Sequence, residues 1–326
     1  MNLSTVQGRC SVICTTYNHA AYAAESIQSI YDQVYRDIEI IIIDDGSKDD
    51  NVAVIRRKLE ESPFPAKLLT QANTGNIGLN VNRAIEASSG HYVTFLSLDD
   101  LLLSNCVSSK LSLMEVDSDL VVVANTTNLK IDETGRVTSD SDSSPIHGMR
   151  LSTAEEILEQ EIKHLRTVFV QGMVVRRCVL DAVGHYDTDK IGDDLVIRTK
   201  IWRHLRENSG MKFQLLPEPG FVYRKHPGNI HRDTLRQLRA IIEWRDTFFP
   251  GRPLPPVFES WTRYFFRHSL RNGHIQRIEE AAASSVEIKE LWDRYRKSWK
   301  YRRGAIKRGL KRALSFGSQD LNDQPD

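Results

Sequence analysis

The sequence predicts an α/β fold with a mainly parallel, Rossmann-like sheet, followed along the chain by an α+β region and a helical C-terminal extension. In the first third, short β-branched apolar segments alternate with segments of helical periodicity, which is typical of consecutive βαβ units. After this region the alternation becomes less regular, and from residue 231 onward no strand pattern remains. A chain of 326 residues is long enough for one large α/β domain with an appendage.

The first third contains five predicted strands with helices between them. The strands are expected at 11–15, 38–43, 66–70, 92–96 and 120–124, and the helices at 22–33, 51–61, 78–88 and 104–116.

The remaining elements are predicted from turn and capping signals. Residues 132–135 form a turn and 139–144 a polar loop. Ser152 and Glu155 fit a capping box that opens a helix. Further strands are expected at 168–175, 213–216 and 221–224, a helical pattern continues to about 314, and 315–326 is a predicted disordered tail.

The charge of the chain is unevenly distributed. Lys plus Arg number 44 and Asp plus Glu 43, which gives a formal net charge of +1. Ten basic residues and no acidic residue lie between Arg294 and Arg312, so the rest of the chain carries 34 basic against 43 acidic residues. This basic stretch and the acidic remainder therefore need separate explanations.

The sequence predicts a cytoplasmic protein. The four cysteines lack the spacing of a zinc site and are expected to be reduced core thiols. The first nine residues contain no apolar segment of a secretory signal. No apolar run approaches the ~20 residues that span a bilayer.

Polar clusters follow four consecutive strands. Each could be a turn or a helix cap, but in an open α/β sheet ligands bind beyond the carboxyl ends of the strands. Two carboxylate pairs in one crevice are costly unless a cation is present, and oxygen ligands suit Mg²⁺ or Mn²⁺ bound with a diphosphate. The clusters are Thr15–Asn18, Asp44–Ser47, Asn73–Asn76 and Ser97–Asp100.

Two common nucleotide-binding motifs do not follow the first strand. The segment there lacks both the phosphate-binding loop Gly-x-x-x-x-Gly-Lys-Ser and the dinucleotide motif Gly-x-Gly-x-x-Gly. The kinase and dehydrogenase hypotheses therefore lose their main support.

Five segments together resemble the motifs of the GT-A, family 2 glycosyltransferases. They are Ser11–Asn18, Ile40–Ser47, Gly90–Asp100, the acceptor-side segment made of Gly172–Arg177, Val183–Asp187 and Gly192–Arg198, and Leu216–Ile230. The resemblance covers about residues 9 to 231. It implies a metal-dependent, inverting transfer of a sugar from a nucleotide-diphospho-sugar, most often a UDP-sugar, with Mn²⁺ or Mg²⁺ as cofactor. It also implies a GT-A catalytic domain at residues 1–230, in which residues 1–105 bind the nucleotide-sugar and residues 106–230 form the acceptor side, before the 231–314 extension.

The resemblance implies roles for individual residues on the donor side. Thr15 and Asp44 would contact the base, with Tyr17 among the nucleotide-binding residues, and Asp45 would lie at the nucleoside. The usual Arg of the 73–85 stretch is absent, so Asn76, Asn80 or Arg83 would substitute for it.

The resemblance also implies the metal ligands and the base. Asp99 would face the ribose and sugar phosphate and Asp100 would bind the metal, both in a motif whose usual first Asp is Ser97. His226 would lie near the metal or diphosphate, although a structural role is the alternative. Asp194 would be the general base, with Asp193 as the alternative.

The basic C-terminal stretch is predicted to be an amphipathic helix over 292–314. Trp and Tyr among Lys and Arg are typical of a helix on an anionic membrane surface, which would suit a lipid-linked acceptor. The alternative is a helix packed on the catalytic domain. The acidic remainder and the lack of a recognition motif argue against nucleic-acid binding.

The expected function is transfer of a sugar to a hydroxyl of a saccharide or lipid-linked acceptor, in surface polysaccharide or glycolipid synthesis. A sugar-phosphate nucleotidyltransferase is a second hypothesis, but it would need a Gly-rich, basic loop after the first strand. A catalytically degenerate, membrane-docked interaction protein is the non-enzymatic alternative.

Overall fold

The computed structural model describes residues 5–138, 142–229 and 233–298. The chain divides into two compact units. The first contains the described residues up to 230 together with Ala240–Leu254, and the second contains those in 231–239 and from 255 onward. The first unit thus includes residues 240–254, which the sequence pattern had placed in the extension.

The first unit is built on one mixed sheet, in the order β3-β2-β1-β4-β8-β6-β9-β5, with β7 paired to β6. The pairs β1–β2, β1–β4, β2–β3 and β6–β9 are parallel, whereas β8 is antiparallel to both of its neighbours. The expected parallel arrangement is found in β3-β2-β1-β4 and in β6–β9, but β5–β9 and β6–β7 are also antiparallel, so the sheet as a whole is mixed. The strands are β1 (Val6–Thr16), β2 (Ile38–Asp44), β3 (Ala66–Thr70), β4 (Gly90–Ser97), β5 (Leu101–Leu102), β6 (Leu120–Ile131), β7 (Asp142–Ser143), β8 (Val174–Arg176) and β9 (Lys212–Arg224).

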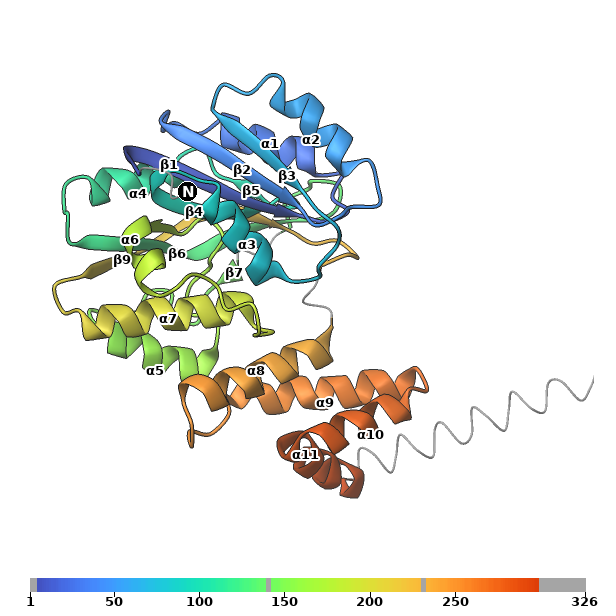
Figure 1. The fold of residues 1–326 in the computed structure, drawn as a ribbon. Helices are drawn as coiled ribbons and strands as arrows, with labels where there is room; N and C mark the ends of the chain where they lie inside the picture. Colours follow the sequence, from blue (N-terminus) through green and yellow to red (C-terminus); the bar gives the residue numbers. More distant parts are fainter. Residues whose placement is uncertain (1–4, 139–141, 230–232, 299–326) are drawn as a thin grey trace, which may run out of the picture. The chain divides into compact units, whose positions relative to one another are not determined.

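Helices cover both faces of this sheet (Figure 1). Alternating side chains of β1 explain this, because Val12 and Cys14 pack with Ile27 and Ile55 on one face while Ile13 packs in the core on the other. The helices of this region are α1 (Ala23–Tyr31), α2 (Asn51–Leu59), α3 (Ile77–Glu86), α4 (Cys106–Met114), α5 (Ala154–His164), α6 (Arg177–Ala182) and α7 (Asp193–Glu207); α8 (Thr234–Phe248) has residues in both units.

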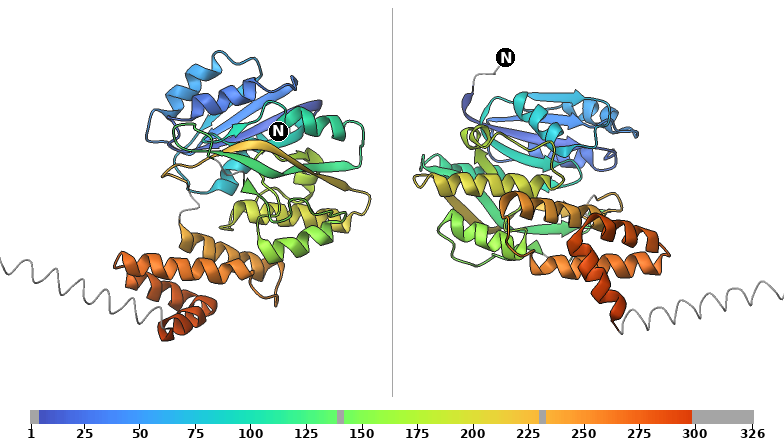
Figure 2. Two further views of the ribbon diagram at one scale, coloured as in Figure 1. Left: turned by 180° about the vertical axis from the view of Figure 1, so that it is seen from behind. Right: turned by 60° about the horizontal axis from the view of Figure 1, so that its bottom comes forward.

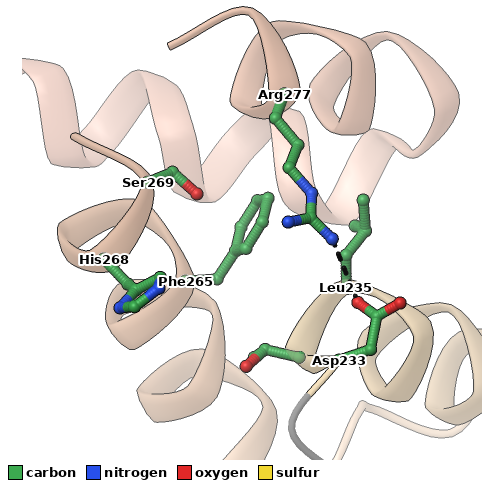
Figure 3. Close-up of a pocket in the computed structure, with 7 residues that line it drawn as sticks. Asp233, Leu235, Phe265, His268, Ser269 and Arg277 are labelled. Atoms are coloured by element: carbon green, nitrogen blue, oxygen red, sulfur yellow. Dashed lines mark hydrogen bonds and ion pairs between the residues drawn. The ribbon is translucent and has the colours of Figure 1, made fainter. Parts of the chain in front are cut away.

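The second unit is helical and contains α9 (Pro256–Arg271), α10 (Ile275–Ser284) and α11 (Val286–Lys297) (Figure 2). Within it Phe266 of α9 is fully buried and its ring lies 5.0 Å from that of Trp292. A pocket of about 290 Å³ lies in this unit, where Arg277 donates to Asp233 at 3.2 Å (Figure 3). Over the described residues, none of the helices has the length and apolar character needed to cross a bilayer.

The C-terminal helix differs from its prediction. Trp292 and Tyr295 were expected either on a helix facing a membrane or on a helix packed on the catalytic domain. They are 4% and 6% exposed and pack against Phe266 of the helical unit. They cannot supply membrane contacts, because the core of the helical unit buries them. The helix that contains them ends at Lys297, and the predicted continuation to 314 and the tail at 315–326 lie outside the described residues.

Several local predictions are corrected. The capping box is formed by Thr153 and Glu156, because the helix begins one residue later than expected. Of the strand predicted at 168–175, only Val174 and Val175 lie in a strand, β8, and Gln171 makes an isolated bridge with Phe95. Val168 and Val170 are apolar because the core buries them. The strands predicted at 213–216 and 221–224 form one strand, β9, with register shifts near Pro219.

Two smaller expectations are also corrected. Cys10, Cys14 and Cys106 are buried free thiols, but Cys178 is exposed. Burial raises the pKa of the Cys10 and Cys14 thiols, which keeps them protonated. In the loop predicted at 139–144, Asp142–Ser143 pairs with β6 as β7, and 139–141 lies outside the described residues.

Candidate functional site

The carboxyl ends of the first strands are aligned at one edge of the sheet. Thr16 at the end of β1 is in register with Asp44 of β2, and Asp44 with Thr70 of β3. Thr15 is in register with Ser97, where β4 ends. The sheet therefore brings the predicted polar clusters to one rim.

Asp44 is held by the turn that follows β2. Its carboxylate is 1% exposed and accepts hydrogen bonds from the Ser47 backbone N–H at 2.9 Å and from Asn51 Nδ2 at 2.7 Å. Gly46 permits this turn, because its φ is +72° and a Cβ there would lie 2.5 Å from the backbone nitrogen of Asn73. Tyr17 is 38% exposed at the same rim. The turn interpretation is thus correct for Asp44, and its role at the base stays a prediction.

Asp45 organises the loop that follows β3. It accepts from Gln71 Nε2 at 2.8 Å, from the Thr74 backbone N–H at 2.9 Å and from that of Gly75 at 2.9 Å. Burial opposes ionisation of this carboxyl, but these hydrogen bonds outweigh it and hold the pKa of Asp45 below its usual range. Asp45 is therefore an ionised anchor for residues 71–75.

The substitutes proposed for the missing Arg have structural partners. Asn76 caps α3 by accepting from the Leu79 N–H at 3.0 Å, and its Nδ2 donates to the Thr188 carbonyl at 2.7 Å. Asn80 is buried and accepts from Gln71 and Thr74. Arg83 is exposed on the same helix. Of the three, Asn76 lies closest in sequence to the loop, and its side chain is partly exposed to solvent.

The structure brings Asp99 and His226 together. Asp99 Oδ2 lies 2.9 Å from Nε2 of His226, and His19 Nε2 lies 3.8 Å from the same oxygen. In the part of the chain that the structure describes, these three residues could hold a metal ion, since their ligand atoms lie within 4.8 Å of one another. Asp99 Oδ1 is buried without a hydrogen-bond partner in the described chain, so the donor set and this oxygen both fit a cation.

The surroundings lower the pKa of both Asp99 and His19. Burial disfavours the Asp99 carboxylate, but the hydrogen bond with His226 and the neighbouring His19 outweigh it and lower the pKa of Asp99. Burial also lowers the pKa of His19, against the opposing effect of Asp99. An anionic carboxylate next to a neutral imidazole is the protonation state that a metal site requires.

Asp100 is directed differently from Asp99. It is 2% exposed, and its Oδ1 accepts from the backbone N–H of Arg224 at 2.8 Å. Burial, with the neighbouring Asp99, raises the pKa of Asp100 well above its usual range. Asp100 is thus fastened to β9 and is not among the three grouped side chains; its assignment as a metal ligand stays a prediction.

The end of β9 positions His226. Arg224 Nε donates to the Asp99 carbonyl at 3.0 Å, and its Nη2 donates to Glu25 at 2.6 Å. Asn229 Oδ1 accepts from the backbone N–H of His226 at 2.7 Å, while the ring of Tyr22 lies 4.9 Å from that of His226. The contacts with Asn229 and Tyr22 therefore fix the His226 imidazole beside Asp99.

The acidic pair opens α7. Asp193 and Asp194 lie in its first turn after Gly192, where carboxylates also favour the helix dipole. Asp194 is exposed at the surface of α7, and the surrounding protein raises the pKa of its carboxyl against the opposing charge of Arg198. A carboxylate with a raised pKa is a stronger proton acceptor.

Sequence reasoning missed two residues of this site. His19 directly follows the first polar cluster, and extending that cluster by one residue would have included it. Asn229 lies three residues after His226 in the segment that carried the resemblance, but only the hydrogen bond reveals its role.

Comparison with known proteins identifies the family. The model of glycosyl transferase family 2 matches residues 11–182, so the chain belongs to this family. GalNAc(5)-diNAcBac-PP-undecaprenol beta-1,3-glucosyltransferase of Campylobacter jejuni is 35% identical over 99 residues, which are 30% of this chain and 32% of that protein. The chain matches only about 28% to 41% of the length of the first curated relatives.

Solved structures show the GT-A fold. Staphylococcus aureus TarS 1–349 in complex with UDP-GlcNAc has a TM-score of 0.57 at 15% identity, covering 80% of this chain and 72% of that one. Mannosyltransferase PcManGT from Pyrobaculum calidifontis, in complex with GDP-Man and Mn²⁺, has a TM-score of 0.54 at 17% identity and covers 98% and 89%. The predicted GT-A fold and family 2 membership are confirmed.

Proposed function

We propose that this protein transfers a sugar from a nucleotide-diphospho-sugar, in particular a UDP-sugar, to a hydroxyl of a saccharide or lipid-linked acceptor with inversion. The observation that carries the proposal is the pairing of Asp99 with His226 at the rim where β1, β2 and β4 end. Carboxylate and imidazole ligands at the carboxyl ends of the strands of an α/β sheet suit a cation that binds a diphosphate.

The similar proteins support the choice of substrates. TarS and the Pyrobaculum mannosyltransferase were solved with UDP-GlcNAc and with GDP-Man and Mn²⁺. The C. jejuni relative is named for an undecaprenol-linked substrate. A nucleotide-sugar donor and a saccharide or lipid-linked acceptor are therefore the substrates proposed for this chain.

The residues divide the chemistry between two sides. Thr15, Tyr17, Asp44 and Asp45 bind the nucleoside, with Asn76 at the adjacent loop. A divalent cation held by Asp99 and His226 would supply positive charge for the leaving diphosphate.

On the acceptor side, Asp194 accepts the proton of the attacking hydroxyl. The acceptor oxygen bonds to the anomeric carbon as the bond to the diphosphate breaks, and one displacement inverts the configuration. The raised pKa of Asp194 suits this task, and Asp193 in the same helical turn is the alternative base.

Product analysis of the purified full chain tests the proposal against its alternatives. Incubation with UDP-sugars, acceptor saccharides and Mn²⁺ is expected to release UDP. Formation of a nucleotide-sugar from a nucleoside triphosphate and a sugar phosphate would instead establish a nucleotidyltransferase. Neither product, with a folded protein, would leave only the degenerate interaction protein.

We further propose that the basic segment 300–312 binds an anionic membrane surface at the cytoplasmic face. Seven of the ten basic residues lie in 300–312, and each adds roughly 1 kcal/mol near such a surface. Cosedimentation with anionic liposomes should be lost on truncation after Ser298. Equal binding by the truncated chain, or no binding at low salt, would contradict this.

A further inference from the structure

His19 lies at the proposed cation site, although the proposed function gives it no role. Its Nε2 is 3.8 Å from Asp99 Oδ2, and its side chain is 14% exposed. Its ring meets that of His226 edge-on, with centroids 5.8 Å apart. His19 therefore faces the same carboxylate oxygen as His226 from a different element of the fold.

The backbone around His19 is fixed by the neighbouring loop. Asn18 adopts φ of 56°, a left-handed conformation that Asn tolerates. Its side-chain oxygen accepts from the Lys48 N–H at 2.7 Å, and its own N–H donates to Ser47 Oγ at 2.8 Å. On the other side, the His19 carbonyl accepts from the N–H groups at the start of α1. The imidazole is thus presented by a rigid turn.

The site lacks partners that the described protein would supply. A separation of 3.8 Å is too long for a hydrogen bond between His19 and Asp99. His19 Nδ1 and Asp99 Oδ1 are buried and have no hydrogen-bond partner among the described residues. Because buried polar atoms are normally paired, the unpaired Asp99 Oδ1 indicates that a ligand from outside the chain completes the site.

We propose that His19 is a third ligand of the cation, so that two imidazoles and one carboxylate select Mn²⁺ or a similar first-row transition metal over Mg²⁺. This inference rests on the proposed function. The ligand atoms lie within 4.8 Å of one another, so small side-chain rotations bring all three onto one ion. Imidazole suits transition metals, whereas Mg²⁺ prefers oxygen ligands and retains several waters. Three protein ligands leave positions open for a diphosphate.

The test measures metal binding by titration calorimetry of the full chain without nucleotide. Mn²⁺ and Mg²⁺ are titrated into the unaltered protein and into His19→Ala, His19→Gln and His226→Ala. His164→Ala, at the exposed end of α5, is the matched control. Circular dichroism verifies that each variant is folded, and the visible absorption of the Co²⁺-loaded proteins reports the loss of a nitrogen ligand.

The proposal predicts that Mn²⁺ affinity falls about tenfold or more in both His19 variants, since changes even outside the ligand set cost about 10–100-fold. Mg²⁺ affinity should change much less, and His164→Ala should match the unaltered protein. Unchanged Mn²⁺ affinity and an unchanged Co²⁺ spectrum in both His19 variants would overturn the proposal.

Further outcomes separate this inference from the proposed function. If His226→Ala loses Mn²⁺ while the His19 variants keep it, the cation site stands and the third ligand is wrong. If the His19 variants weaken only UDP binding measured in EDTA, His19 contacts the diphosphate and the proposal is also wrong. If the unaltered protein transfers sugar but binds no Mn²⁺, the cation site itself fails.

Discussion

Asn82 and Tyr186 are joined by two hydrogen bonds across 104 residues of chain. Asn82 Nδ2 donates to the Tyr186 carbonyl at 2.8 Å, and the Tyr186 N–H donates to Asn82 Oδ1 at 2.9 Å. Asn82 lies in α3, beside the loop that Asp45 organises, whereas Tyr186 precedes the acidic pair of α7. This pair of hydrogen bonds connects the donor side of the proposed site to its acceptor side.

Asn82→Ala is expected to lower turnover more than nucleotide affinity, because it releases the segment that leads to Asp194. Loss of these bonds should also reduce the free energy of unfolding by about 1–3 kcal/mol. Steady-state kinetics, calorimetric UDP binding and chemical denaturation measure the three effects, with Asn272→Ala as an exposed control. Full turnover at reduced stability would show that the link is structural only.

Asp194→Asn is expected to reduce transfer by roughly 10²–10⁴-fold, the usual contribution of a general base, while the affinity for the donor is retained. Asp193→Asn, in the same helical turn, is the matched comparison and should be milder. The loss of transfer is measured as the initial rate at a saturating donor concentration, and the affinity for the donor is measured by calorimetry. A larger loss in Asp193→Asn would exchange the roles of the two carboxylates.

The same Asp194→Asn substitution is expected to raise the melting temperature near pH 7. The folded protein raises the pKa of Asp194, so folding favours its protonated form. Stability from this group is complete below the unfolded value of about 4 and is lost as the pH rises through the folded pKa. Thermal unfolding at pH 7.5 and pH 4 measures this. A stabilisation that persists unchanged at pH 4 would disprove the explanation.

Asp99→Asn and Asp100→Asn should differ in metal binding. Asp99 shares an oxygen with two imidazoles, whereas Asp100 accepts from the backbone of β9, a role that an amide oxygen can fill. Mn²⁺ affinity is expected to fall about tenfold or more for Asp99→Asn and to change little for Asp100→Asn. The reverse result in calorimetric titrations would establish Asp100 as the ligand, as the family motif had suggested.

The sequence was sufficient to predict the parallel strands β1 to β4 and the polar rim at their ends, but not the short strands β5 and β7. The apolar runs of β1 and β2 reflect burial on both faces of a central sheet, so strand positions could be predicted from apolar residues alone. The same signal failed at Val168 and Val170, because burial without strand pairing gives the same apolar residues. The membrane-facing prediction for Trp292 was wrong for another reason. An aromatic residue among basic ones is equally compatible with burial, and Trp292 packs on Phe266.

The composition of the site was less predictable than its position. The motif order placed Asp99 and His226 at one site, although 127 residues separate them. It could not show that the Asp100 carboxylate is directed to the backbone of Arg224, because adjacent side chains in a turn diverge. His19 directly follows the first polar cluster in the sequence, but only its distance to Asp99 shows that it belongs to the site.

A thermal-shift titration of the full chain with nucleotide-sugars, with and without Mn²⁺, measures whether the protein binds a donor through a cation at Asp99. Ligands that bind only the folded state raise its melting temperature in proportion to saturation. We expect a UDP-sugar to raise the melting temperature with increasing concentration, by a large amount with Mn²⁺ and by a small amount in EDTA. In Asp99→Asn, the rise should be equally small under both conditions. No rise with any nucleotide-sugar at millimolar concentration, with or without Mn²⁺, would contradict it.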